Sequence, residues 1–221
     1  LATAPFLRSG HAAAWDPVNN VMYVFGGKNE SAYSNDIWKY SFASNAWTEI
    51  VPSGDEMPLQ RAFASAVWDP TKKEMIVHGG ENATITFLST WNYKPALNKW
   101  IHRTSAPWAR SLHAACWDST NNVMTVFGAG GAQGNNDTWT YDPATDSWGA
   151  NAKMPASWRS ATCGVYDPVN KRMLVFGGRD WNQIYLGETR NFTLGNATKK
   201  YYPDGWINSP ILDLPSSAST G

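Results

Sequence analysis

Four arginines recur at nearly constant spacing along the 221-residue chain. They are Arg8, Arg61, Arg110 and Arg159, separated by 53, 49 and 49 residues. A guanidinium group suits oxyanions because its N–H donors form a planar fork. Four such groups around one opening would make a ligand-binding site for a carboxylate, a sulfate or an acidic peptide. The same groups could instead pair with acidic side chains and backbone carbonyls nearby, and the sequence leaves both interpretations open.

Each arginine opens a copy of one longer motif. An aromatic–Asp pair begins seven residues after it, followed by a Met-x-Val segment and then by two glycines, of which the third copy keeps only the first. These pairs are Trp15-Asp16, Trp68-Asp69, Trp117-Asp118 and Tyr166-Asp167. Three copies continue with Trp-x-Tyr and a second Trp seven residues beyond the Tyr. The chain is therefore built from four internal repeats.

The repeated unit has the pattern of β-strands. Residues 21–25 form a β-branched and aromatic run between Asn-Asn and Gly-Gly, and residues 37–42 alternate with a period of two. We expect four short antiparallel strands per unit, near 11–15, 21–25, 37–42 and 46–50 in the first copy. A sheet this small cannot bury both of its faces alone, whereas copies stacked around an axis can. The predicted fold is an all-β propeller of four-stranded antiparallel blades.

The motif resembles kelch repeats over about residues 5–192. The resemblance rests on the period near 50, the glycine pair after a hydrophobic strand, and the Tyr followed seven residues later by Trp. It implies a ring of blades that binds acidic peptides in some members and acts as a copper-radical sugar oxidase or a sialic acid epimerase in others. The oxidase members need Tyr and His copper ligands and a Tyr-Cys crosslink, a setting that neither cysteine has here. We expect no catalytic residues and no cofactor.

The two ends of the chain depart from the repeat. In the fourth copy, Arg190 and Phe192 stand where the other copies have Trp and Tyr. We expect a propeller over 1–192, an irregular last strand or cap over 193–207, and a Ser- and Pro-containing tail or linker over 208–221. The first seven residues resemble the end of a preceding unit, so a closed four-bladed ring and part of a larger ring both remain open.

Histidine and cysteine give weaker signals. His11 and His113 share one repeat position, but no Cys, Asp or Glu completes a ligand set, so we predict no metal site. Cys116 and Cys163 fall on the same face of the first strands of neighbouring copies. They could form a disulfide between blades, or they could be two small buried side chains.

Five Asn-x-Ser/Thr sequons are present, at Asn29, Asn82, Asn136, Asn191 and Asn196. The first three follow the glycine position and lie in the loop before the third strand, where a glycan would be exposed. These sequons and the 16% content of charged residues favour a secreted or extracellular protein. A cytoplasmic adaptor is the alternative.

The charge balance excludes several classes of partner. Eighteen basic and eighteen acidic residues give no net charge, which argues against nucleic-acid binding, and no apolar run is long enough for membrane insertion. The leading hypothesis is a noncatalytic extracellular propeller that acts as a binding module or as a structural building block of a glycoprotein assembly. Its partners would be other protein chains or further repeats. The alternatives are a carbohydrate-active or small-anion enzyme using the arginines, and an intracellular adaptor that binds an acidic peptide.

Overall fold

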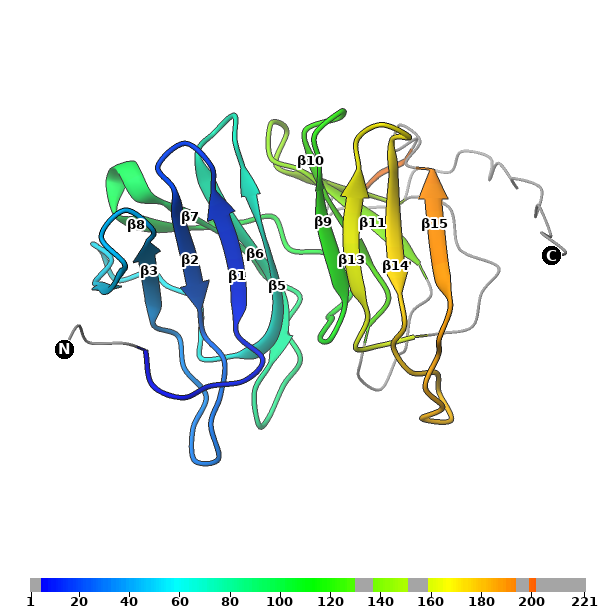
Figure 1. Ribbon diagram of the computed structural model, residues 1–221, viewed down its shortest axis with the longest axis horizontal. Helices are drawn as coiled ribbons and strands as arrows, with labels where there is room; N and C mark the ends of the chain where they lie inside the picture. The colour runs from blue at the N-terminus through cyan, green and yellow to red at the C-terminus, as the bar shows by residue number, and fades with distance from the viewer. Residues whose placement is uncertain (1–4, 130–136, 151–158, 194–198, 202–221) are drawn as a thin grey trace, which may run out of the picture.

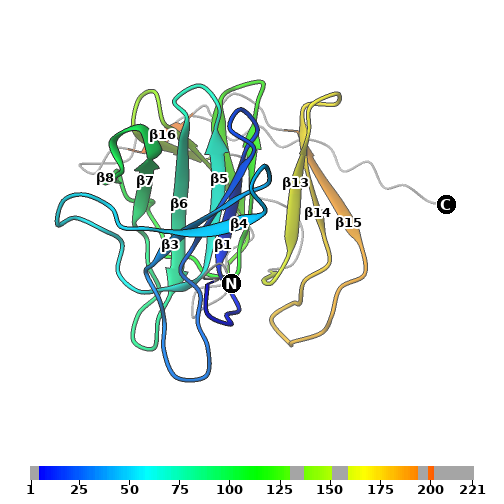
Figure 2. The same cartoon turned by 60° about the vertical axis from the view of Figure 1, so that its left-hand side comes forward.

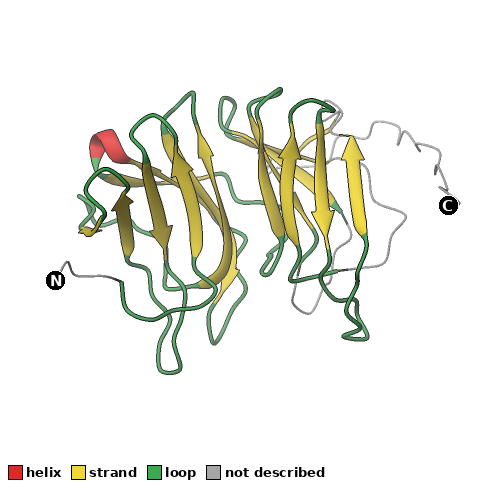
Figure 3. Cartoon of the chain, in the orientation of Figure 1, coloured by secondary structure: helices red, strands yellow, loops and turns green. Residues whose placement is uncertain are grey.

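The computed structural model describes residues 5–129, 137–150, 159–193 and 199–201 of the chain, and the side chains up to residue 191 within these ranges. Strands and loops make up nearly all of the described part, with one short 3-10 turn at Pro95–Leu97 (Figure 3). None of the described helical segments could cross a membrane. The fold is therefore all-β, as the sequence predicts.

The strands form four antiparallel blades arranged as a β-propeller (Figure 1). Blade 1 contains β1 (Ala12–Asp16), β2 (Val21–Phe25), β3 (Ile37–Ser41) and β4 (Ala46–Ile50). Blade 2 contains β5 (Ala62–Asp69), β6 (Glu74–Glu81), β7 (Thr90–Lys94) and β8 (Lys99–Arg103). Blade 3 contains β9 (Ala114–Asp118), β10 (Val123–Phe127), β11 (Thr138–Asp142) and β12 (Ser147–Ala150). Blade 4 contains β13 (Cys163–Asp167), β14 (Arg172–Phe176) and β15 (Thr189–Thr193).

Each first hairpin is closed by the Asp of the aromatic–Asp pair. In blade 1, Asp16 is buried, and its Oδ1 accepts hydrogen bonds from the backbone N–H of Val18 at 2.9 Å and of Asn19 at 3.3 Å. Asn20 follows in the left-handed region with φ 51°. The same Asp turn recurs at Asp69, Asp118 and Asp167. These carboxylates therefore stabilise turns.

Aromatic side chains fill the wedges between neighbouring blades. The first strands pack in chain order, with β1 on β5 (Figure 2), β5 on β9, and β9 on β13 (Figure 1). Between blades 1 and 2, Tyr23 stacks on Trp68 with ring centroids 5.6 Å apart, and Phe25 contacts Trp100 at 5.0 Å. Similar apolar clusters join blade 2 to blade 3 and blade 3 to blade 4. Packing of this kind gives small sheets a buried core.

A chain of backbone hydrogen bonds also joins the blades, where each first strand begins. Gly10, Phe63, Leu112 and Ala161 occupy equivalent positions there, all with positive φ. The N–H of Phe63 donates to the Gly10 carbonyl at 2.6 Å. Leu112 donates in the same way to Phe63 at 3.0 Å, and Ala161 to Leu112 at 2.8 Å. Each blade is therefore tied to the preceding one by the same backbone contact.

The last strand departs from the repeat. A short strand, β16 (Lys199–Tyr201), lies in the segment predicted as an irregular strand or cap, and it pairs with β12 at the outer edge of blade 3. Blade 3 therefore has five strands, and the described part of blade 4 has three. The repeat places a wedge-filling Trp near residue 199, but Lys199 stands there, so this segment lacks the side chain that anchors the last strand in the other blades.

Candidate functional site

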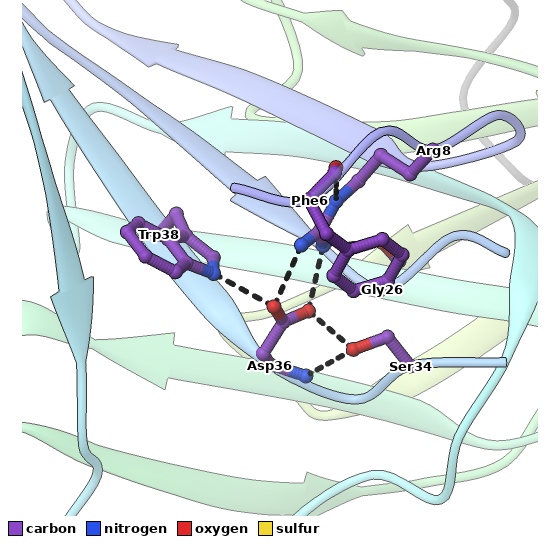
Figure 4. Close-up of polar contacts among 6 residues, drawn as sticks. All are labelled: Phe6, Arg8, Gly26, Ser34, Asp36 and Trp38. Carbon is purple, nitrogen blue, oxygen red and sulfur yellow. Dashed lines mark hydrogen bonds and ion pairs between the residues drawn. The ribbon is translucent and has the colours of Figure 1, made fainter. Parts of the chain in front are cut away.

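The arginine of blade 1 is held inside its own blade (Figure 4). Arg8 Nη1 donates to the Gly26 carbonyl at 2.8 Å and to Asp36 Oδ1 at 2.6 Å, while its Nη2 donates to Asp36 Oδ2 at 2.7 Å. Asp36 also accepts hydrogen bonds from Ser34 Oγ and from Trp38 Nε1. Burial acts to raise the pKa of Asp36, but the hydrogen bonds from Arg8, Ser34 and Trp38 lower it overall. The arrangement links the glycine end of β2 to the start of β3.

Blade 3 repeats this arrangement with an arginine that is more completely buried. Arg110 is fully buried and donates to the Gly128 carbonyl at 3.0 Å and to Asp137 Oδ1 at 2.7 Å. Trp139 Nε1 donates to the other carboxylate oxygen of Asp137 at 2.7 Å. The carboxylate therefore neutralises the arginine and orients the tryptophan at the same time.

Blade 4 keeps the ion pair but changes its surroundings. Arg159 donates to the Gly177 carbonyl at 3.3 Å and to Glu188 Oε1 at 2.5 Å. Arg190, which replaces the tryptophan, also pairs with Glu188 at 2.8 Å. The Glu188 pKa is lowered, first by the hydrogen bond from Arg159 and then by that from Arg190.

Blade 2 lacks the acidic partner. Arg61 is 1% exposed and donates to the Gly79 carbonyl at 2.9 Å and to Ser89 Oγ at 3.0 Å. Its guanidinium carbon lies 3.9 Å from the centroid of the Phe87 ring. Burial lowers the pKa of Arg61 to about 10. Trp91 Nε1, which corresponds to the tryptophan donors of blades 1 and 3, is buried with no partner in the described part of the chain.

The four guanidinium groups therefore point into their own blades, where glycine carbonyls and, in three blades, carboxylates accept their hydrogen bonds. This geometry favours the pairing interpretation over an open anion-binding mouth. Ligand binding by Arg8, Arg61, Arg110 and Arg159 stays an untested prediction.

A buried histidine pair joins blades 2 and 3, and sequence reasoning missed it. The His78 and His113 rings lie 5.4 Å apart, and Ser65 Oγ is 2.6 Å from His113 Nε2. Burial and then Arg110 lower the pKa of His113 to about 3, and burial holds the pKa of His78 well below 6.5. His11 is exposed. The described residues contain no cluster of three or more metal-ligating side chains.

The two cysteines are free thiols and form no disulfide in the structure. Cys116 is buried in the cluster between blades 3 and 4, whereas Cys163 is exposed. The strand pairings place Cys163 on the side of blade 4 opposite to Gly164, and Gly164 is the residue that contacts blade 3. Equal parity along the strands therefore places the two thiols on the corresponding faces of successive blades, and only the face of blade 3 is covered by the next described blade.

Three of the five sequon asparagines lie in the described part. Asn29 and Asn82 begin the loops after the glycine pairs, and each Oδ1 accepts two backbone N–H groups two and three residues ahead. Asn29 is exposed and Asn82 is partly exposed. Asn191 is exposed on β15, and Asn136 and Asn196 fall outside the described residues.

Exposed apolar side chains gather at one end of the propeller, which we call the loop end. This end contains the starts of the first and third strands, the ends of the second strands, and the loops that join them. Its exposed large hydrophobic residues are Phe6, Leu7, Met57, Leu59, Ile85, Leu88, Trp108, Trp181, Ile184 and Tyr185. At the opposite end, an open cavity of about 400 Å³ is lined by residues that include Trp15, Trp68 and Trp117.

A propeller of repeated antiparallel blades, each with a buried arginine bonded to a glycine carbonyl, defines the class of this protein. Residues 2–156 match the KLHDC2/KLHL20/DRC7 Kelch-repeats domain, which is 70% of the chain. The chain belongs to this kelch-repeat family.

Curated relatives are similar over parts of their length. Kelch-like protein 35 of Mus musculus is 26% identical over 160 residues, which is 72% of this chain and 25% of that protein. Kelch domain-containing protein 2 of Bos taurus is 31% identical over 129 residues, 56% of this chain and 30% of that protein. N-(sulfonatooxy)prop-2-enimidothioate sulfolyase of Thlaspi arvense is 26% identical over 141 residues, 61% of this chain and 39% of that protein. The chain spans less than half the length of each.

Proposed function

We propose that this kelch-repeat propeller is a noncatalytic protein-binding module that holds its partner at the loop end. The observation that carries the proposal is the gathering of ten exposed large hydrophobic residues on the loops of that end. Exposed apolar patches with polar surroundings are typical of protein–protein interfaces. The buried arginines fix these loops to the sheets and leave the loop side chains available to a partner.

The extracellular part of the proposal rests on the sequons. Asn29 and Asn82 start loops whose backbone is already fixed by their own side-chain carbonyls, and the amide nitrogen that a glycan would modify is not used in those bonds. On this proposal the protein is a secreted glycoprotein that binds other chains or builds a larger assembly.

Affinity capture with matched variants tests the binding proposal. The wild-type protein, a loop-end variant (Leu88→Lys with Tyr185→Lys) and an opposite-end variant (Val18→Lys with Val169→Lys) would capture proteins from the native source. All four positions are exposed, so folding is preserved. We expect a partner retained by the wild type and the opposite-end variant and lost by the loop-end variant. Equal retention by all three would reject the loop end as the site.

The mass of the protein from its native source tests localisation. Treatment with peptide N-glycosidase should remove mass if the sequons are modified. Five unmodified sequons would reject the extracellular proposal and favour the intracellular adaptor.

An enzyme is the second candidate, because one relative carries the name of a sulfolyase. A thermal-shift screen with sulfate, carboxylates and acidic sugars tests it. A hit abolished by Arg8→Gln but kept by Lys39→Gln would support the arginine site, and the absence of such a hit would remove that support.

A further inference from the structure

Among the described blades, only blade 2 has a buried arginine without an acidic partner. In the other three blades, the arginine Nη2 donates to a carboxylate, at 2.7 Å to Asp36 and to Asp137 and at 2.5 Å to Glu188. Arg61 Nε donates to the Leu59 carbonyl at 2.9 Å, but Arg61 Nη2 has no acceptor in the described part of the chain. The atom that binds a carboxylate elsewhere is therefore without one in blade 2.

The tryptophan at the start of the third strand provides a second donor. In blades 1 and 3, its Nε1 donates at 2.7 Å to the same aspartate that pairs with the arginine, as Figure 4 shows for blade 1. Trp91 stands at this position in blade 2, and its Nε1 is buried with no partner among the described residues. Ser89 stands at the aspartate position and reaches only Arg61 Nη1, at 3.0 Å. The repeat therefore aims two donors at the place of one carboxylate.

The surroundings of Arg61 supply no negative charge. No ion pair among the described residues includes Arg61, and the Phe87 ring lies 3.9 Å from its guanidinium carbon. Burial lowers the pKa of Arg61 only to about 10, so the guanidinium stays charged at pH 7. A buried charge without a counter-charge is strongly unfavourable. Because Ser89 is partly exposed, an ion from solution can reach this position.

We propose that Arg61 Nη2, Trp91 Nε1 and Ser89 Oγ bind a chloride ion at the position that an aspartate carboxylate occupies in blades 1 and 3. The Ser89 oxygen accepts a hydrogen bond from Arg61 Nη1, so its own proton is free to be donated to the ion. A position of carboxylate size suits a single-atom anion and excludes a sulfate or a sugar acid. The ion links the arginine to the start of β7 and does not depend on a partner at the loop end.

The chloride dependence of stability tests the site. Thermal unfolding of the purified chain is measured while chloride replaces gluconate at constant ionic strength, because gluconate is too large for the position and charge screening then stays unchanged. Chloride at about ten times its dissociation constant should raise the unfolding midpoint by about 3–6 °C. A midpoint that does not change with chloride would overturn the proposal.

Two pairs of variants test whether the effect arises at this position. Ser89→Asp supplies a carboxylate from the chain and should abolish the chloride response, whereas Ser44→Asp adds the same charge on an exposed turn and should keep it. Trp91→Phe removes one donor and should weaken chloride binding about tenfold. Trp38→Phe is its control, because Trp38 Nε1 is bonded to Asp36, and should leave the chloride affinity unchanged. A full response in either Ser89→Asp or Trp91→Phe would overturn the proposal.

Bromide locates the ion directly. Crystals soaked in sodium bromide should show an anomalous peak within hydrogen-bonding distance of Arg61 Nη2 and Trp91 Nε1, and crystals of Ser89→Asp should show none there. Peaks confined to other surface positions would identify adventitious ions only, which would contradict the assignment of this site.

Discussion

Blades 2 and 3 have the same strands and the same buried arginine, but they stabilise that arginine differently. In blade 3, Asp137 accepts hydrogen bonds from both Arg110 and Trp139. In blade 2, Ser89 stands at that position, so Arg61 has no carboxylate partner and Trp91 Nε1 has none in the described part of the chain.

Two further positions separate these blades. His78 in blade 2 replaces the phenylalanine found as Phe127 in blade 3, and Lys73 takes the left-handed turn position that Asn122 occupies. The difference teaches that the repeat tolerates polar changes at buried sites as long as glycine carbonyls still accept the arginine hydrogen bonds. We therefore expect loss of the carboxylate partner to destabilise blade 3, and addition of such a partner to stabilise blade 2.

The largest expected effect is on blade 3. Asp137→Ala leaves Arg110 buried without a carboxylate and removes the acceptor of Trp139, so we expect a loss of about 3–5 kcal/mol in the free energy of unfolding, measured by urea denaturation. Asp137→Asn keeps an oxygen that can accept the hydrogen bond from Trp139, so it should lower the free energy of unfolding by less than Asp137→Ala. An unchanged unfolding midpoint for Asp137→Ala would show that the ion pair does not stabilise the blade.

The next effect concerns the histidine of blade 2. The pKa of His78 is lowered in the folded state by burial and by His113, Arg110 and Arg61. As the pH decreases below about 6.5, His78 is protonated in the unfolded chain but stays neutral in the folded one, so the free energy of unfolding decreases as the pH decreases. His78→Phe should remove about 2 kcal/mol of the stability loss between pH 7 and pH 5. Denaturation at both pH values measures this, and Lys39→Gln is the surface control. An equal pH dependence in wild type and variant would contradict the assignment.

A gain in stability is expected from adding the carboxylate that blade 2 lacks at Ser89. Ser89→Asp gives Arg61 a carboxylate and Trp91 an acceptor, which should raise the free energy of unfolding by about 1–2 kcal/mol at pH 7. Ser89→Asn supplies an acceptor oxygen without the negative charge, so it should raise the free energy of unfolding by less than Ser89→Asp. If the two variants are equal, the missing carboxylate is not what distinguishes Arg61 from Arg110.

The smallest effect is in the first turn. Lys73 has φ 53° and Asn122 has φ 55°, and asparagine tolerates this conformation better than lysine. Lys73→Asn should therefore raise the free energy of unfolding by about 0.5–1 kcal/mol, and the reciprocal Asn122→Lys should lower it by a similar amount. Thermal unfolding of both variants measures this, and changes of the same sign would contradict the explanation.

Much of the fold could be predicted because the repeat carries it. The strand expected over 21–25 is β2, and Asp36, Asp137 and Glu188 could be recognised beforehand as partners for the arginines. The contact of His78 with His113 could not, because it depends on how far one blade is displaced along the next. The pairing of β16 with β12 also lay beyond the sequence, since residues 199–201 lack the repeat's tryptophan.

The backbone hydrogen bonds between the blades have a consequence for hydrogen exchange. The amides of Phe63, Leu112 and Ala161 exchange only when a blade separates from the one before it, because their acceptors belong to that blade. Amides inside a sheet, such as those shared by β6 and β7, exchange when the blade itself opens. The exchange rates of these three amides therefore measure how long neighbouring blades stay together, separately from how long each blade stays folded.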